Sequence, residues 1–146
     1  MPSTVFVLLA AAGAALVAQN MLMARISESS STILIPLVLN SAVGLFALLG
    51  LLIARSGMTG VQEALSSFKV WNVLPGLLGS FFVFASIFGY QRLGAAATIA
   101  TLVGTQLAFG LAIDIFRTGN IRGYEGAMVG ALLLAIGASL IVFRSN

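Results

Sequence analysis

Side-chain amides and hydroxyls occur inside long apolar runs of this sequence, and they are its best candidates for chemistry. Gln106 lies within "LVGTQLAFGLAID", residues 102–114, and Asn40 lies within "LVLNSAV", residues 37–43. A polar group that leaves water without finding a partner costs several kcal/mol, so such groups face a bundle interior, a wet cavity or a ligand. Their recurrence in several apolar runs indicates a neutral, hydrogen-bonding cavity.

The polar side chains within the apolar runs form the predicted substrate-binding set. They are Gln19, Asn20, Asn40, Ser86, Thr98, Thr105 and Gln106. Thr98, Thr101 and Thr105 follow an i, i+3, i+7 spacing, which places them on one stripe of a helix. Two plainer interpretations stay open: an amide can simply join two helices, and a threonine can bond back to its own helix.

Asp114 is predicted to lie at the rim of this cavity. It comes near the end of its apolar run, three residues before Arg117, where water and a positive charge can reach it. A proton-coupled carrier usually keeps an ionisable group inside the membrane. Asp114 is the one candidate for such a coupling group, although its depth argues against that role.

The sequence lacks the residues on which most enzymes depend. It has no histidine and no cysteine, and its carboxylates are confined to Glu28, Glu63, Asp114 and Glu125, near the ends of apolar runs or between them. No nucleophile–base pair and no metal-ligand cluster follows from such a set. We therefore expect no enzyme, no metal and no cofactor. The basic residues are scattered singly, which also argues against a nucleic-acid partner.

The elements that position these residues follow from the composition. Hydrophobic residues make up 60% of the 146 residues and charged residues 8%, against about 25% charged in soluble domains. A bilayer-spanning helix needs roughly 20 apolar residues. Five segments meet that length: 4–24, 33–54, 71–91, 95–116 and 124–143. The sequence predicts an all-α integral membrane protein, a single five-helix transmembrane domain over residues 1–146, with the lipid bilayer as its main partner.

The connections between these segments are short. Ser31 or Thr32 is a candidate N-cap for the second segment, with Pro36 in its first turn. Residues 55–71 predict a short helix in the headgroup region, with Thr59 and Gln62 at capping-box spacing and Trp71 as an interfacial anchor. The segment "QRLG", residues 91–94, predicts a tight hairpin between the third and fourth spans.

The charge balance gives little preference for one orientation in the membrane. One side of a five-span topology holds four basic residues, Arg55, Lys69, Arg117 and Arg122, and the other holds three, Arg25, Arg92 and Arg144. Loops rich in Lys and Arg stay cytoplasmic, so a difference of one residue hardly biases insertion. Two interpretations follow: a single orientation set by other factors, or an antiparallel, dual-topology dimer that makes a ten-helix bundle.

The fifth segment carries a packing motif that suits such a dimer. Gly126 and Gly130 stand at GxxxG spacing, and Gly137 follows on the same face. Small residues let helices in lipid approach closely. The glycines predict a dimer interface, although packing within one chain would explain them as well.

The segment "WNVLPGLLGSFFVFASIFGYQRLGAAATIATLVGTQLAFGLAIDIF", residues 71–116, resembles the hairpin of helices three and four in the drug/metabolite transporter superfamily, specifically its small five-helix bacterial YdcZ-type branch. The likeness extends over nearly the whole chain. Its telling pieces are Gln19, Gly44, Gly76, Gly79, "RLGAA" at residues 92–96, Gln106 and Asp114. The chain departs from the family pattern at Met23, Gln91 and Ile115, where Asn, Pro and His are usual.

The resemblance implies a multi-pass protein of the bacterial inner membrane that forms antiparallel pairs, as a homodimer or with a related paired subunit. It implies a transporter that moves a small polar or amphipathic solute by alternating access. A channel and a non-transporting partner subunit are the alternatives. The related small multidrug resistance proteins keep a glutamate in helix one, which this chain lacks. Cation/proton exchange therefore does not carry over, and the solute, coupling ion and direction are not determined by the sequence.

Overall fold

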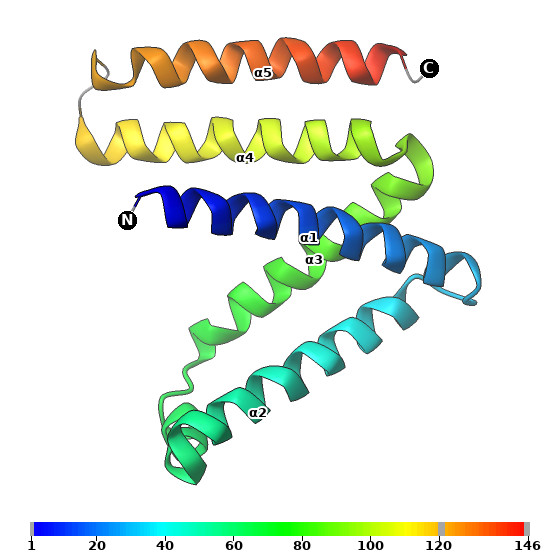
Figure 1. The fold of residues 1–146 in the computed structure, drawn as a ribbon, viewed down its shortest axis with the longest axis vertical. Helices are drawn as coiled ribbons and strands as arrows, with labels where there is room; N and C mark the ends of the chain where they lie inside the picture. The colour runs from blue at the N-terminus through cyan, green and yellow to red at the C-terminus, as the bar shows by residue number, and fades with distance from the viewer. Residues whose placement is uncertain (1, 120–121, 145–146) are drawn as a thin grey trace. The chain divides into compact units, whose positions relative to one another are not determined.

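The computed structural model of the chain describes residues 2–119 and 122–144, which are helical except for short connections (Figure 1). The long helices are α1 (Pro2–Glu28), α2 (Leu34–Ser66), α3 (Val73–Leu93), α4 (Ala95–Thr118) and α5 (Glu125–Arg144). Short 3-10 turns, η1 (Val70–Asn72) and η2 (Arg122–Tyr124), precede α3 and α5. All five long helices are sufficiently long and apolar to cross a membrane, which confirms the predicted all-α class and its five spans.

The predicted headgroup helix is joined to the second span as one long element, α2, with a sharp break at Gly57. Gly57 has φ 62° and ψ −160°, values that a residue with a side chain rarely adopts. The Thr59 hydroxyl donates to the Ser56 carbonyl at 2.6 Å across this break, instead of capping the following turn as the Thr59–Gln62 spacing predicts. Trp71 is 80% exposed just beyond, as an interfacial anchor requires.

The helices fall into two compact units, residues 1–88 and 89–146, and the boundary lies within α3. In the first unit, α1 and α2 contact each other near their connection at residues 29–33. The N-cap of α2 is Ile33, one residue later than Thr32, the second of the two predicted candidates, and it makes no side-chain cap. The Thr32 hydroxyl only accepts a long 3.4 Å hydrogen bond from the Leu34 N–H.

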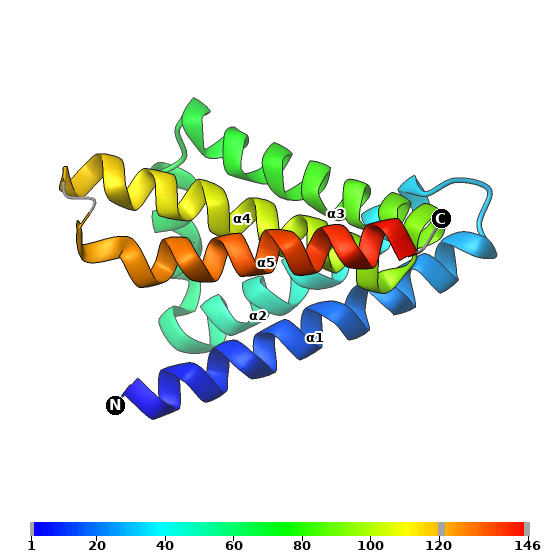
Figure 2. The same cartoon turned by 90° about the horizontal axis from the view of Figure 1, so that it is seen from above.

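In the second unit, α4 and α5 lie side by side in both ribbon views (Figures 1 and 2). Gly119 ends α4 in a left-handed conformation, with its N–H donating to the Ile115 carbonyl at 2.9 Å. A glycine suits this position, because it adopts a positive φ, here 63°, without strain. The facing surfaces of the two helices consist mainly of small residues, which allow their close approach.

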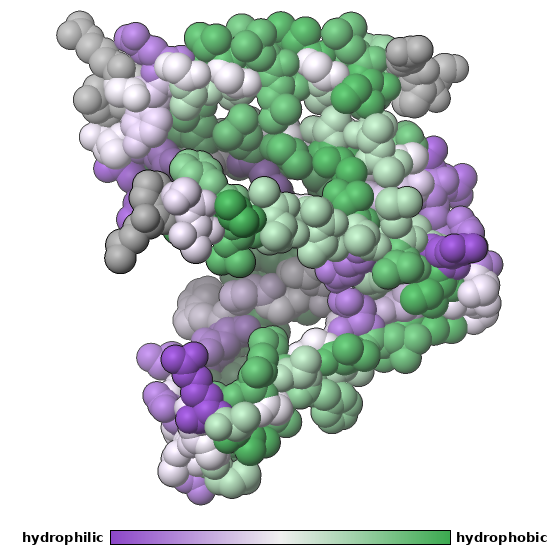
Figure 3. All heavy atoms as spheres, viewed as in Figure 1, coloured by the Kyte–Doolittle hydropathy of each residue, from purple (hydrophilic) through white to green (hydrophobic). Residues whose placement is uncertain are grey.

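Few side chains are buried within the described part of the chain. The buried apolar side chains there are those of Met23, Ala24, Pro36, Ile87 and Ala97, whereas large side chains such as Phe46 and Phe116 are exposed. Figure 3 shows hydrophobic residues along the visible faces of α2 and α5, with hydrophilic residues gathered at helix ends. In water this surface would drive aggregation, so its place is against lipid or another protein.

The connection predicted from "QRLG" is a single residue, Gly94, with φ 81° and ψ 168°. Nearby, α3 and α4 approach so closely that a Cβ on Gly89 would stand 2.7 Å from Cγ2 of Thr98 and 2.8 Å from its hydroxyl oxygen. Thr98 is 4% exposed, and its hydroxyl donates to the Gly94 carbonyl at 2.8 Å, so it has little freedom to move aside.

We expect Gly89→Ala to destabilise the purified protein by about 1 to 3 kcal/mol, because the added methyl overpacks this contact. The loss is measured as a lower thermal unfolding midpoint. Gly110→Ala is the matched control, since nothing lies within 4 Å of the place that its methyl group would take. It should leave the midpoint unchanged or raise it slightly through helix propensity. Equal midpoints for the two variants would contradict this prediction, because they would show that the contact accommodates the added methyl group without loss of stability.

Candidate substrate-binding site

Gln19 and Asn40 form a side-chain hydrogen bond between two separate helices. The Gln19 Nε2 donates to the Asn40 Oδ1 at 3.0 Å, joining α1 to α2 across 21 positions of sequence. The same nitrogen lies 3.9 Å from the sulfur of Met23, one turn further along α1. Both amides are half-buried, so each keeps an accessible side. Two residues predicted separately as cavity groups are thus brought together.

This pair stands in the wall of a cavity of about 530 Å³ between the two helices, called here the α1–α2 groove. Its lining is apolar apart from the two amides: Ala15, Ala18, Gln19, Leu22, Met23, Ile26, Pro36, Leu39, Asn40 and Val43. An apolar cavity of a few hundred Å³ with a small number of polar groups is the usual form of a small-molecule site.

The groove lies nearer to one end of its helices. Gln19 is nine residues before the end of α1 and Asn40 is six residues after the start of α2. At a rise of about 1.5 Å per residue, the pair is about 14 Å and about 9 Å from those ends. The hydrocarbon core is about 30 Å thick. The amides therefore lie within the apolar layer, in the half that adjoins the connection at residues 29–33.

Asn20 does not line the groove, although it follows Gln19 directly. It lies on a buried face of α1 with Met23, Ala24 and Ser27, at i, i+3, i+4 and i+7. Asn20 is 3% exposed, and its Oδ1 has no hydrogen-bond partner among the described residues. A buried acceptor without a donor costs about 1 to 3 kcal/mol. Asn20 is therefore separate from the Gln19–Asn40 pair, and its role in binding stays a prediction.

The hydroxyl groups of the predicted set bond back to their own helices. The Ser86 hydroxyl donates to the Phe82 carbonyl at 2.7 Å, and Ser86 is fully buried. Thr98, Thr101 and Thr105 donate to the carbonyls of Gly94, Ala97 and Thr101, each at 2.8 Å. Bonding back to the same helix, the plainer of the two interpretations, thus accounts for the hydroxyl protons of these residues. Their oxygens can still accept a hydrogen bond.

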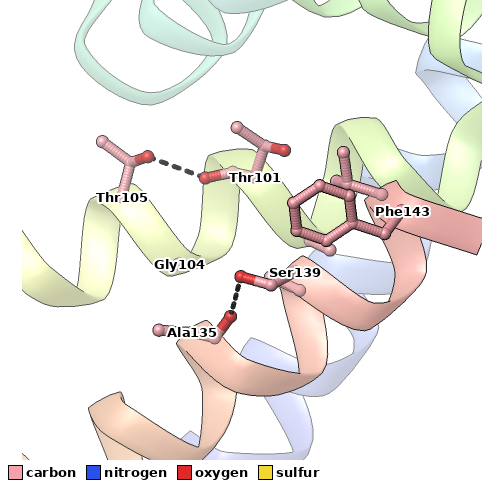
Figure 4. Close-up of a pocket in the computed structure, with 9 residues that line it drawn as sticks. Thr101, Gly104, Thr105, Ala135, Ser139 and Phe143 are labelled. Atoms are coloured by element: carbon pink, nitrogen blue, oxygen red, sulfur yellow. Dashed lines mark hydrogen bonds between the residues drawn. The ribbon is translucent and has the colours of Figure 1, made fainter.

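Two of these threonines also line a second cavity, of about 370 Å³, between α4 and α5 (Figure 4). Thr101, Gly104 and Thr105 lie on the α4 side of this α4–α5 groove, and Ala135, Ser139 and Phe143 lie on the α5 side. The Ser139 hydroxyl donates to the Ala135 carbonyl at 2.8 Å. No amide lines this cavity, so it offers weaker hydrogen bonding than the α1–α2 groove.

Gln106 and Asp114 are exposed on α4. Gln106 makes no side-chain hydrogen bond to the residues that the structure describes, so the expected pairing with Gln19, Asn20 or Asn40 stays a prediction. The Asp114 backbone carbonyl accepts a hydrogen bond from the Thr118 hydroxyl at 2.8 Å. Asp114 lies four residues before the end of α4, and its role at the rim of a cavity stays a prediction.

The predicted interface glycines leave an open face on α5. Gly126 and Gly130 are exposed and Gly137 is half-buried, and nothing lies within 4 Å of a Cβ placed on any of them. No group of three metal-binding side chains occurs in the described part of the chain.

The sequence analysis missed Met23 and Pro36 as lining residues of the α1–α2 groove. Met23 could have been found, because its i+4 spacing places it on the same helix face as Gln19. It also missed Tyr90, whose hydroxyl is buried without a partner within the described residues. No local pattern marks that tyrosine.

Comparisons with known proteins agree on one family. The family described as "Putative inner membrane exporter, YdcZ" matches residues 4–140 of the chain. The chain is also 53% identical, over 139 residues, to the "Inner membrane protein YdcZ" of Escherichia coli (strain K12), which covers 94% of this chain and 93% of that protein. No solved structure matches the chain.

Proposed function

Because the chain belongs to the YdcZ family of inner membrane exporters, we propose that it carries a small polar or amphipathic solute across that membrane by alternating access, as an antiparallel dimer. The family points to a membrane transporter rather than an enzyme. Membership of the family does not include the alternating-access mechanism, the class of solute or the dimer, and these are what we propose.

The observation that carries the proposal is the Gln19–Asn40 pair in the wall of the α1–α2 groove. Binding energy for a solute in lipid must come from polar groups that are already desolvated and held in place. The pair meets both conditions, since each amide is held by the other and is half-buried. A solute that uses these amides would be bound within the apolar layer and released to either side as the groove opens.

Solute counterflow in liposomes that contain only this chain tests the transport step. A thermal-shift screen of small metabolites and cationic drugs on the detergent-purified protein selects the solute that stabilises it most. We expect saturable counterflow of that solute by the wild type. Gln19→Leu should reduce it by about five- to tenfold, because it removes a hydrogen-bonding group worth about 1 to 1.5 kcal/mol.

Ser41→Ala is the matched control for this experiment, since Ser41 is exposed and neighbours Asn40 but does not line the groove. It should transport as the wild type does. Flux that never saturates would identify a channel, and flux that needs a second, related chain would identify a partner subunit. Either result contradicts the proposal.

The balance of charge and the position of the groove both support the antiparallel dimer. The α1–α2 groove of each chain lies in one half of the apolar layer. Two copies of opposite orientation would place one groove near each membrane face. Such a pair supplies both entrances of an alternating-access carrier from one sequence.

Labelling of single cysteines in intact cells tests the dual orientation, and the chain has no cysteine of its own. Ser31 and Ser67 are exposed and flank α2, so they lie on opposite membrane faces in any one chain. We expect a membrane-impermeant maleimide to label about half of the molecules of Ser31→Cys and about half of those of Ser67→Cys, because the charge bias is so small.

Complete labelling at one position with none at the other would establish a single orientation and exclude the antiparallel pair. Adding Ser66→Arg to each cysteine variant provides the control. The extra positive charge should hold that side in the cytoplasm, which lowers labelling at position 67 and raises it at position 31.

We infer that α5 forms the dimer interface, because one of its faces packs toward α4 and the opposite face has no neighbour among the described residues. The face toward α4 carries Ala135, Ala138, Ser139, Val142 and Phe143, which line the α4–α5 groove. Gly126, Gly130 and Gly137 stand about 160° around the helix from that face, at 3.6 residues per turn. The glycine face is therefore free for another helix to approach closely.

Gly130→Leu should shift the purified protein from dimer to monomer, because the leucine fills the groove between the glycines. Light scattering of the protein in detergent measures the mass. Gly110→Leu is the control, since Gly110 is equally open but lies on α4. If Gly130→Leu stays as dimeric and as stable as the control, the interface lies elsewhere.

A further inference from the structure

We propose that the α1–α2 groove selects neutral solutes that carry a carboxamide group, binding its carbonyl and its N–H at once. This inference rests on the proposed transport function and names its substrate class. It follows from the hydrogen-bonding capacity that the Gln19–Asn40 pair leaves unused.

Each side-chain amide offers two N–H donors and one carbonyl acceptor. Gln19 uses its Nε2 toward Asn40 and faces the Met23 sulfur with the same group. The Gln19 Oε1 and the Asn40 Nδ2 make no hydrogen bond to the described residues. The pair therefore presents one carbonyl acceptor and one amino donor, on adjacent side chains, to whatever occupies the groove.

This complement does not depend on how the two amides are turned. A hydrogen bond between two amides always uses one amino group and one carbonyl, so it leaves one carbonyl and one amino group. A carboxamide is the matching group, because its N–H can donate to the free carbonyl while its own carbonyl accepts from the free amino group. An ester or ketone can use only half of this complement.

The charge of the lining excludes the ionic alternatives. None of the ten groove-lining residues is titratable, and eight of them are apolar. An ammonium or carboxylate would lose its hydration on entering without gaining a counter-charge, which is costly in a medium of low dielectric. The apolar walls instead favour a solute whose remaining part is a short hydrocarbon.

The other polar side chains along the spans do not offer the same combination. The hydroxyls of Ser86, Thr98, Thr101 and Thr105 donate to carbonyls of their own helices. Gln106 is exposed and lines neither groove. The Gln19–Asn40 pair offers both a free donor and a free acceptor in the wall of the α1–α2 groove.

A series of probes that share an unbranched six-carbon chain tests the inference by calorimetry on the full chain in lipid nanodiscs. The probes are hexanamide, N,N-dimethylhexanamide, methyl hexanoate, hexanoate and hexylammonium. We expect hexanamide to bind at least about tenfold more tightly than N,N-dimethylhexanamide, which keeps the carbonyl but has lost both N–H donors. Hexanoate and hexylammonium should bind more weakly still.

Variants locate the discrimination in the groove. The double variant Gln19→Leu/Asn40→Leu should bring hexanamide and its dimethyl derivative to within about twofold of each other, because a single remaining amide would still offer both a carbonyl and an amino group. Ser41→Ala should keep the wild-type ratio. The ratio compares two probes on the same protein, so a variant that folds in lower yield still gives a valid ratio. The wild-type series tests the inference even if no variant folds.

Equal binding of the two amides by the wild type would overturn the inference, and so would tighter binding of hexylammonium or hexanoate. Absence of binding by every probe would overturn it too. These outcomes leave the transport proposal standing, because saturable counterflow of the solute from the thermal-shift screen tests that proposal separately. Loss of counterflow for every solute in that screen would instead remove the proposed function.

Discussion

The structure depends on one constraint: a polar group inside a bilayer is costly unless it has a hydrogen-bond partner, and the backbone groups must find theirs within the protein. For the backbone this requires helices, and the described ranges are helical throughout their apolar segments. Serine and threonine meet the constraint locally, since hydroxyls such as those of Ser80 and Ser139 donate to carbonyls one turn back. A side-chain amide is too rich in donors and acceptors for that solution. Gln19 and Asn40 therefore meet across two helices, and this contact defines the groove.

The same constraint explains why the chain buries so little of itself. In lipid, apolar side chains gain almost nothing by leaving the solvent, so helices associate through small residues and polar contacts. Both kinds of contact occur here: α4 meets α5 through alanines, serine and glycine, and α1 meets α2 near an amide pair. A protein with so small a core is suited to rearrangement of its helices, because little packing must be broken.

The groove is neutral, and this property links its structure to the proposed transport. The charged residues lie near the helix ends or in connections, while the groove combines apolar walls with two amides. Amides hold a neutral polar solute by directional hydrogen bonds without attracting ions. The two halves of an antiparallel pair would each offer such a site, displaced toward opposite faces. Specificity would then come from hydrogen-bond geometry instead of charge.

Composition and periodicity alone determined the all-α class and the five spans, because these depend on local sequence and on the lipid solvent. They also marked Gln19 and Asn40 as cavity residues. Only the tertiary structure decided that these two amides pair with each other and that Asn20 is buried without lining the groove. It also decided that Thr98 lies against Gly89. The reason is physical: an isolated helix specifies the direction of each side chain, but its partner depends on which helix approaches and at what depth.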